Sequence, residues 1–154
     1  MSEPRSPSVD ERPSVDGQHS RPPGTSDALV ATVGAFSEAL ERIERARGAL
    51  YEFHQLTGGA DGMLDEVVAG LREAGFDELA GHVEEELIGR NVVEGRWSFQ
   101  LVEDYDDDYY AVWRELERTV REETLGGRRH VFEAEMKQRR RTAGRRGHEA
   151  TPEG

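Results

Sequence analysis

The chain has 154 residues, of which 35% are hydrophobic and 34% charged, and its formal net charge is −12. Because it contains no cysteine, disulfides, thiolate zinc sites and cysteine nucleophiles are excluded. No apolar run approaches the ~20 residues that span a bilayer, and the first residues lack the apolar stretch of a secretory signal. We therefore expect a cytoplasmic protein that makes no membrane contact.

Charge and proline are distributed unevenly along the chain. Residues 1–25 contain five of the six prolines and few apolar side chains, which predicts a disordered leader. Residues 26–136 carry a net charge of −15, whereas residues 137–154 carry +4. We expect a helical domain over 26–140 and a disordered basic tail over 141–154.

The first half of the domain has the periodicity of amphipathic helices. Residues 26–57 predict a long helix that ends at Gly58-Gly59, and residues 61–74 predict a second helix that stops at Gly75. A third helix is expected over 77–89. The apolar stripe of the first helix comprises Leu29, Val33, Phe36, Leu40, Ile43, Leu50, Phe53 and Thr57, and that of the second comprises Met63, Leu64, Val67, Val68 and Leu71.

The segment 98–125 predicts a second long helix, which begins at Ser98 as N-cap and stops at Gly126-Gly127. Steps of three and four separate its apolar residues, and the pattern continues through an acidic run, residues 103–108. The stripe comprises Val102, Tyr105, Tyr109, Val112, Leu116 and Val120. A last short helix is expected over 128–140.

The acidic run also matches part of a calcium-binding loop. Asp104, Asp106, Asp108 and Glu115 fall at four ligand positions, but the position that requires glycine holds Tyr109. In a loop, the apolar residues of the helical stripe would also no longer lie on one face. We therefore interpret the run as a solvated face of a continuous helix.

These elements predict an all-α fold. We expect a helical bundle built on a long antiparallel helix pair, about 26–57 and 98–125, with the shorter helices packed on it. The equal lengths of the two predicted helices favour this pairing, since about 30 residues extend to about 45 Å in each.

Histidines and carboxylates offer an alternative, metal-binding interpretation. Bundles that hold two metal ions use glutamates together with Glu-x-x-His pairs, and this chain has only the reversed spacing, at His82 and His130. The reversed spacing disfavours metal, so we expect no cofactor and no metal. The residues of this alternative site are His54, His82, Glu86, Asp104, Asp108, His130 and Glu133.

Catalytic sequence motifs are missing. The chain has no nucleophile elbow, no phosphate-binding glycine loop and no dinucleotide fingerprint. Aromatic and arginine side chains of the kind that dominate protein interfaces do occur between 90 and 113. We expect a partner-binding surface that includes Arg90, Arg96, Trp97, Tyr110 and Trp113.

Four segments resemble those of small conserved helical proteins of actinobacteria. They are residues 50–56 (LYEFHQL), 89–92 (GRNV), 96–100 (RWSFQ) and 126–130 (GGRRH). The resemblance covers about residues 26–148. It implies an actinobacterial host and assigns no role to any residue.

The sequence therefore favours a non-enzymatic helical interaction or regulatory protein that self-associates or binds a protein partner. The alternative function is a metal-binding or enzymatic helical bundle that uses histidine and acidic residues. The arginine-rich segment 137–146 offers a contact for nucleic acid, but the acidic body opposes a polyanion.

Overall fold

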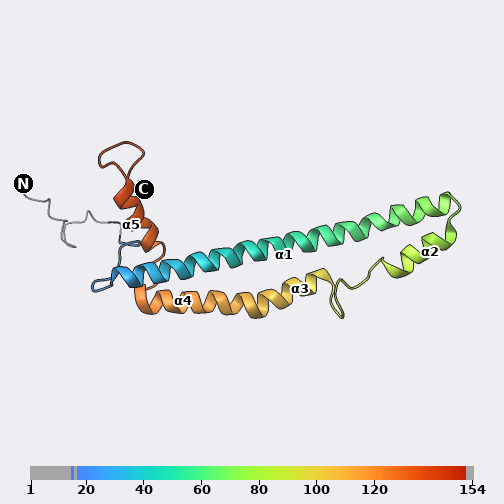
Figure 1. Cartoon of the computed structure of the whole chain (residues 1–154), viewed down its shortest axis with the longest axis horizontal. Helices are drawn as coiled ribbons and strands as arrows, with labels where there is room; N and C mark the ends of the chain where they lie inside the picture. The colour runs from blue at the N-terminus through green and yellow to red at the C-terminus, as the bar shows by residue number, and fades with distance from the viewer. Residues whose placement is uncertain (1–14, 16, 152–154) are drawn as a thin grey trace, which may run out of the picture. The chain divides into compact units, whose positions relative to one another are not determined.

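A computed structural model describes residue 15 and residues 17–151 (Figure 1). Within these residues the chain is helical and forms no strand beyond one isolated bridge between Val93 and Arg96. The predicted all-α class is therefore confirmed. The elements are α1 (Asp27–Glu73), α2 (Asp77–Glu86), α3 (Ser98–Tyr105), the π-helix η2 (Asp106–Tyr110), α4 (Ala111–Leu125) and α5 (Val131–Arg140).

The chain divides into two compact units. Unit 1 contains the described residues up to Ala39 and those from Glu115 onward, and unit 2 comprises Leu40–Arg114. The predicted disordered leader lies mostly outside the described residues. Its last part, from Gly17, is described, and there Arg21 forms ion pairs with Asp27 and Glu135.

Helix α1 does not end at Gly58-Gly59, so the predicted boundary at this pair is wrong. Figure 1 shows one uninterrupted coil, and the two expected helices, 26–57 and 61–74, are parts of it. The reason is packing: the face of α1 that is covered in unit 2 keeps its spacing of three and four residues across the glycines. The partly or fully buried residues on this face are Leu50, His54, Thr57, Asp61, Leu64, Val68 and Leu71.

The helix ends instead at Gly75, as predicted. Gly75 has a φ of +83°, and the Phe76 N–H donates to the Leu71 carbonyl at 2.8 Å while the Gly75 N–H donates to the Arg72 carbonyl at 3.0 Å. This pair of bonds is the Schellman arrangement, which satisfies carbonyls at a helix C-terminus and favours glycine at the left-handed position. Gly58 and Gly59 lack such a positive φ.

The acidic run is helical, as the periodicity predicted, and the calcium-loop interpretation is excluded there. However, the run contains η2, whose wider turn joins residue i to i+5 and advances the next buried face by about one residue. Tyr110 and Glu117 are consequently buried, whereas Tyr109, Val112 and Leu116 are each about half exposed. The predicted stripe is therefore wrong at Tyr109, Val112 and Leu116, whereas Val120 packs against the core as predicted.

The core of unit 1 is small. Val30 and Val33 from the start of α1 pack with Leu125 and Val131, and each of the four is at most 3% exposed. Beside this core the buried carboxylate of Glu117 accepts hydrogen bonds from Ser37 at 2.9 Å and from Arg121 at 3.2 Å. Arg121 also donates to the carbonyl of Gly127, at 2.7 Å, which ties the end of α4 to the network.

Alanine substitutions at two glycines test whether α1 is continuous. An added Cβ at Gly59 or Gly62 meets nothing within 4 Å, and a mid-helix glycine costs about 1 kcal/mol relative to alanine. We expect Gly59→Ala and Gly62→Ala each to raise the free energy of unfolding by about that amount, measured by urea denaturation. If α1 instead ended at Gly58-Gly59 with a left-handed cap, Gly59→Ala would lower it.

The Glu117 network tests the packing of unit 1. Arg121→Leu leaves a carboxylate that is 6% exposed without its cation, so we expect a loss of about 3 kcal/mol in the free energy of unfolding. The control is Arg118→Leu, which breaks exposed pairs with Glu115 and Glu122 and is expected to cost less than about 1 kcal/mol. Equal losses in the two variants would contradict the network's role.

Candidate interaction surface

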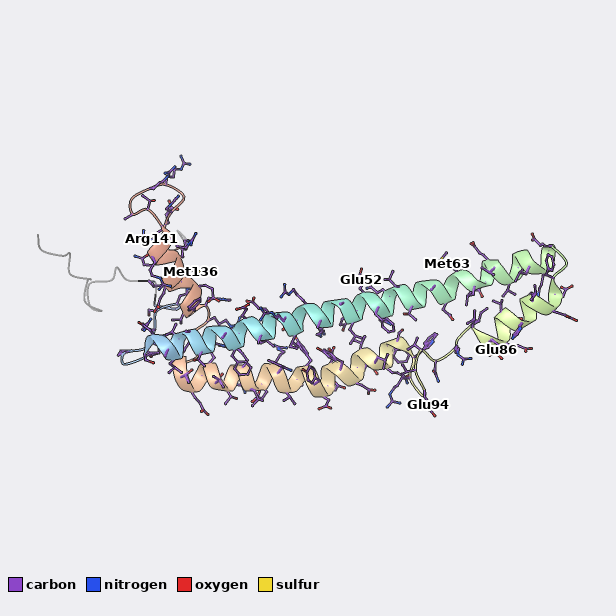
Figure 2. All side chains as sticks on the ribbon, viewed as in Figure 1. Glu52, Met63, Glu86, Glu94, Met136 and Arg141 are labelled. Atoms are coloured by element: carbon purple, nitrogen blue, oxygen red, sulfur yellow. The ribbon has the colours of Figure 1, made fainter. Side chains whose placement is uncertain are left out.

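The second half of α1 has an apolar face that the described residues leave uncovered. Its residues recur at steps of three and four over about 36 Å of helix, and none of them is charged. We call this face the exposed seam; it comprises Ala46, Ala49, Phe53, Leu56, Ala60, Met63, Val67 and Gly70, all of which are exposed. Figure 2 labels Met63 on the edge of α1 opposite α2 and α3.

The large side chains of the exposed seam project into solvent. Phe53 is 42% exposed, Leu56 67%, Met63 70% and Val67 47%. The sequence predicted the opposite for Phe53, Met63 and Val67, which were expected to face the core. Burial of apolar surface is the main driving force for protein association, so this continuous apolar face is the candidate interaction surface.

The covered face of α1 lies roughly 100° of helical rotation from the exposed seam, because each residue advances the helix by that angle. Polar side chains attach it to η2 and α3. The guanidinium of Arg47 donates to both oxygens of Asp106 at 2.6 and 2.9 Å, and the hydroxyl of Tyr110 donates to Glu44 at 2.8 Å. The exposed seam is therefore the face left after unit 2 has packed on its other side.

The borders of the exposed seam differ in chemistry. One border carries Glu52, Glu66 and Glu73, and none of these three forms an ion pair with another described residue. Figure 2 labels Glu52 on the same edge of α1 as Met63. The other border consists of the partly buried residues Leu50, Thr57, Leu64 and Leu71. The surface is thus an apolar strip with one acidic side.

Tyr110 and Trp113, two residues of the predicted partner surface, are not freely exposed. Tyr110 is 9% exposed, and the guanidinium of Arg47 lies 4.8 Å from its ring centre. Burial raises the pKa of the Tyr110 hydroxyl, as does its hydrogen bond to Glu44. Trp113 is partly buried and its ring lies edge-on to Tyr109, with 6.3 Å between centres. Tyr110 therefore belongs to the packing of η2 on α1.

The other three residues of that predicted surface lie together before and at the start of α3. The Trp97 indole donates to the Arg90 carbonyl at 2.9 Å, and Arg96 pairs with Asp104 at 2.7 Å. Trp97, not Ser98, occupies the N-cap position, and its N–H donates to the side chain of Gln100 at 2.7 Å. Ser98 is buried, and its hydroxyl lies 2.8 Å from Nδ1 of His54.

The residues of the alternative metal site are not gathered into a ligand set. Among the described residues, no group of three histidine, aspartate or glutamate side chains is placed to hold a metal ion. His54 bonds Ser98, Asp104 pairs with Arg96, and Glu86 pairs with Arg90. His130 lies 3.9 Å from Glu133, and in the described part of the chain neither His82 nor Asp108 completes a ligand set with these pairs.

The basic segment 137–146 begins in the last turn of α5 and continues beyond it. Arg139, Arg140, Arg145 and Arg146 are exposed, and none of the described tail bases pairs with an acid of α4. No helix in the described part of the chain is both long and apolar enough to cross a membrane. Comparisons of the chain with protein-family models, with curated proteins and with solved structures find no match.

The Arg47–Asp106 pair gives the stability a defined pH dependence. The hydrogen bond from Arg47 holds the pKa of Asp106 below its ordinary value, so this stabilisation is complete above about pH 4 and is lost as the pH falls through the lowered pKa. We expect the free energy of unfolding, measured in urea at pH values from about 6 to 2, to fall more steeply in the native chain than in Arg47→Gln. Parallel profiles would show that the pair does not act in solution.

Proposed function

We propose that the protein is a helical interaction module that self-associates, with the exposed seam of α1 as its contact surface. One observation carries the proposal: four large apolar side chains at heptad-like spacing are 42–70% exposed. Alternating steps of three and four are the spacing with which helices pack side by side as coiled coils. A second copy supplies the same uncharged strip and thereby covers it.

The acidic border favours a parallel over an antiparallel arrangement of the two copies. In a parallel pair, the border with Glu52 and Glu66 faces the apolar border of the second helix, which contains Thr57 and Leu71. In an antiparallel pair, the two acidic borders face each other and repel. The expected contact is therefore parallel and in register.

We also propose that, within each chain, the two long helical segments form the antiparallel pair expected from the sequence. Support comes from three contacts of unit 2, in which Glu44, Arg47 and His54 bond Tyr110, Asp106 and Ser98 in reverse chain order. This pairing covers one face of α1 and leaves the exposed seam for a partner. A cytoplasmic location remains the expectation from composition.

The association is tested by measuring the molar mass of variants that carry new glutamates either on the exposed seam or on another exposed face of α1. We expect size-exclusion chromatography with light scattering to give a dimer for the native chain and a monomer for the double variant Leu56→Glu, Met63→Glu, because two buried carboxylates oppose the contact. The matched control is Gln55→Glu, Ala69→Glu, which adds the same charge on an exposed face away from the seam. Circular dichroism verifies that both variants remain helical.

The orientation is tested by a single cysteine, since the chain has none of its own. Ala49→Cys lies toward one end of the exposed seam, so its sulfurs meet in a parallel dimer and lie about 30 Å apart in an antiparallel one. We expect oxidation to yield a disulfide-linked dimer. A dimer that resists this cross-link refutes the parallel arrangement, and a double-glutamate variant that stays dimeric refutes the exposed seam as the contact.

A further inference from the structure

Unit 2 contains a cavity beside the exposed seam, and Ala60 belongs to both. It has a volume of about 340 Å³ and is lined by α1, by the segments that follow α2 and by the start of α3. A closed apolar cavity of about 150 Å³ is large enough to bind benzene. The cavity therefore has room for a molecule with an apolar body of about ten carbon atoms, in the size range of small-molecule sites.

The wall of the cavity is mostly apolar. Its apolar lining includes Leu64, Leu87, Trp97 and Phe99. The indole of Trp97 is held by its hydrogen bond to the Arg90 carbonyl and packs edge-on against Phe99, with ring centres 6.1 Å apart. The aromatic part of the wall is thus positioned before any ligand arrives, which reduces the entropy lost on binding.

Hydrogen-bond donors line the same cavity. Nη1 of Arg90 donates at 3.3 Å to a carboxylate oxygen and to the carbonyl of Glu86, and both side chains are at least 60% exposed. His54 uses Nδ1 for Ser98, which leaves Nε2 for a ligand. The one acid in the lining, Asp61, already accepts a hydrogen bond from the Gly89 N–H at 2.8 Å. An anionic group therefore fits this lining better than a cationic one.

Gly58 keeps the cavity open. It lines the cavity from the middle of α1, where glycine weakens a helix, and an added Cβ would meet no atom within 4 Å. Packing against a neighbour therefore does not explain the glycine. A side chain introduced at position 58 would project from the wall of the cavity and occupy space that a ligand needs.

The geometry points to a binding site for an apolar monocarboxylic acid. The hydrocarbon body lies against Trp97 and Phe99, and the carboxylate accepts hydrogen bonds from Arg90 and from Nε2 of His54. The site lies mainly on the covered side of α1 and shares Ala60 with the exposed seam. Its donors, Arg90 and His54, lie outside the exposed seam, so substitution of Arg90 tests binding without removing a seam residue.

The test uses decanoate as the probe and the fluorescence of Trp97 as the signal. The full-length chain carries Trp113→Phe, so that Trp97 is its one tryptophan. We expect saturable binding of one decanoate per chain at concentrations below its micellar range. Decanol, which keeps the chain but lacks the charge, is expected to bind about tenfold more weakly.

Three variants locate the site. Gly58→Phe fills the cavity and is expected to abolish decanoate binding, whereas the control Gly62→Phe, also at an open helical position but outside the lining, retains it. Arg90→Gln is expected to weaken decanoate about tenfold and to leave decanol unchanged. Equal binding of decanoate and decanol overturns the carboxylate assignment. The proposed site is overturned if Gly58→Phe and Gly62→Phe bind decanoate equally well. It is also overturned if the parent chain with Trp113→Phe alone shows no saturable binding.

Discussion

Within unit 2, helix α1 has two apolar faces, and the other segments of unit 2 cover only one of them. The covered face contacts η2 and α3 through a few polar anchors, chiefly the bidentate bond between Arg47 and Asp106. The other face, the exposed seam, leaves Leu56 and Met63 at least two-thirds exposed. Exposure of an apolar strip of this length to water is unfavourable, and this cost is the physical basis of the proposed self-association.

The same constraint explains why α1 continues through its glycines. A helix that ended at Gly58-Gly59 would separate His54 from Leu64, and the covered face would lose its common direction. Continuation keeps both faces aligned along one axis at the cost of about 1 kcal/mol for each mid-helix glycine. Gly58 also leaves space beside Trp97, where the cavity lies. One backbone feature thus serves the packing, the proposed contact and the cavity.

The sequence predicted the helical class and several boundaries well, because these depend on local periodicity and glycine caps. The acidic run was correctly predicted to be helical from its neighbours, and Gly75 ends α1 as expected. Periodicity does not reveal which of two adjacent stripes is covered, so Phe53, Met63 and Val67 were wrongly placed toward the core. The π-turn at Asp106–Tyr110 has no sequence signature, and it moved Tyr110 inward in place of Tyr109.

The candidate site was only partly predictable for the same reason. Trp97, Arg90 and Arg96 lie in one region, as expected from their closeness in sequence, but the exposed seam needed knowledge of what covers α1. The most direct test of the account is sedimentation equilibrium of the unmodified chain over a range of concentrations. The account predicts association to about twice the 17.3 kDa chain mass. A mass of 17.3 kDa at every concentration up to about 100 μM would contradict it.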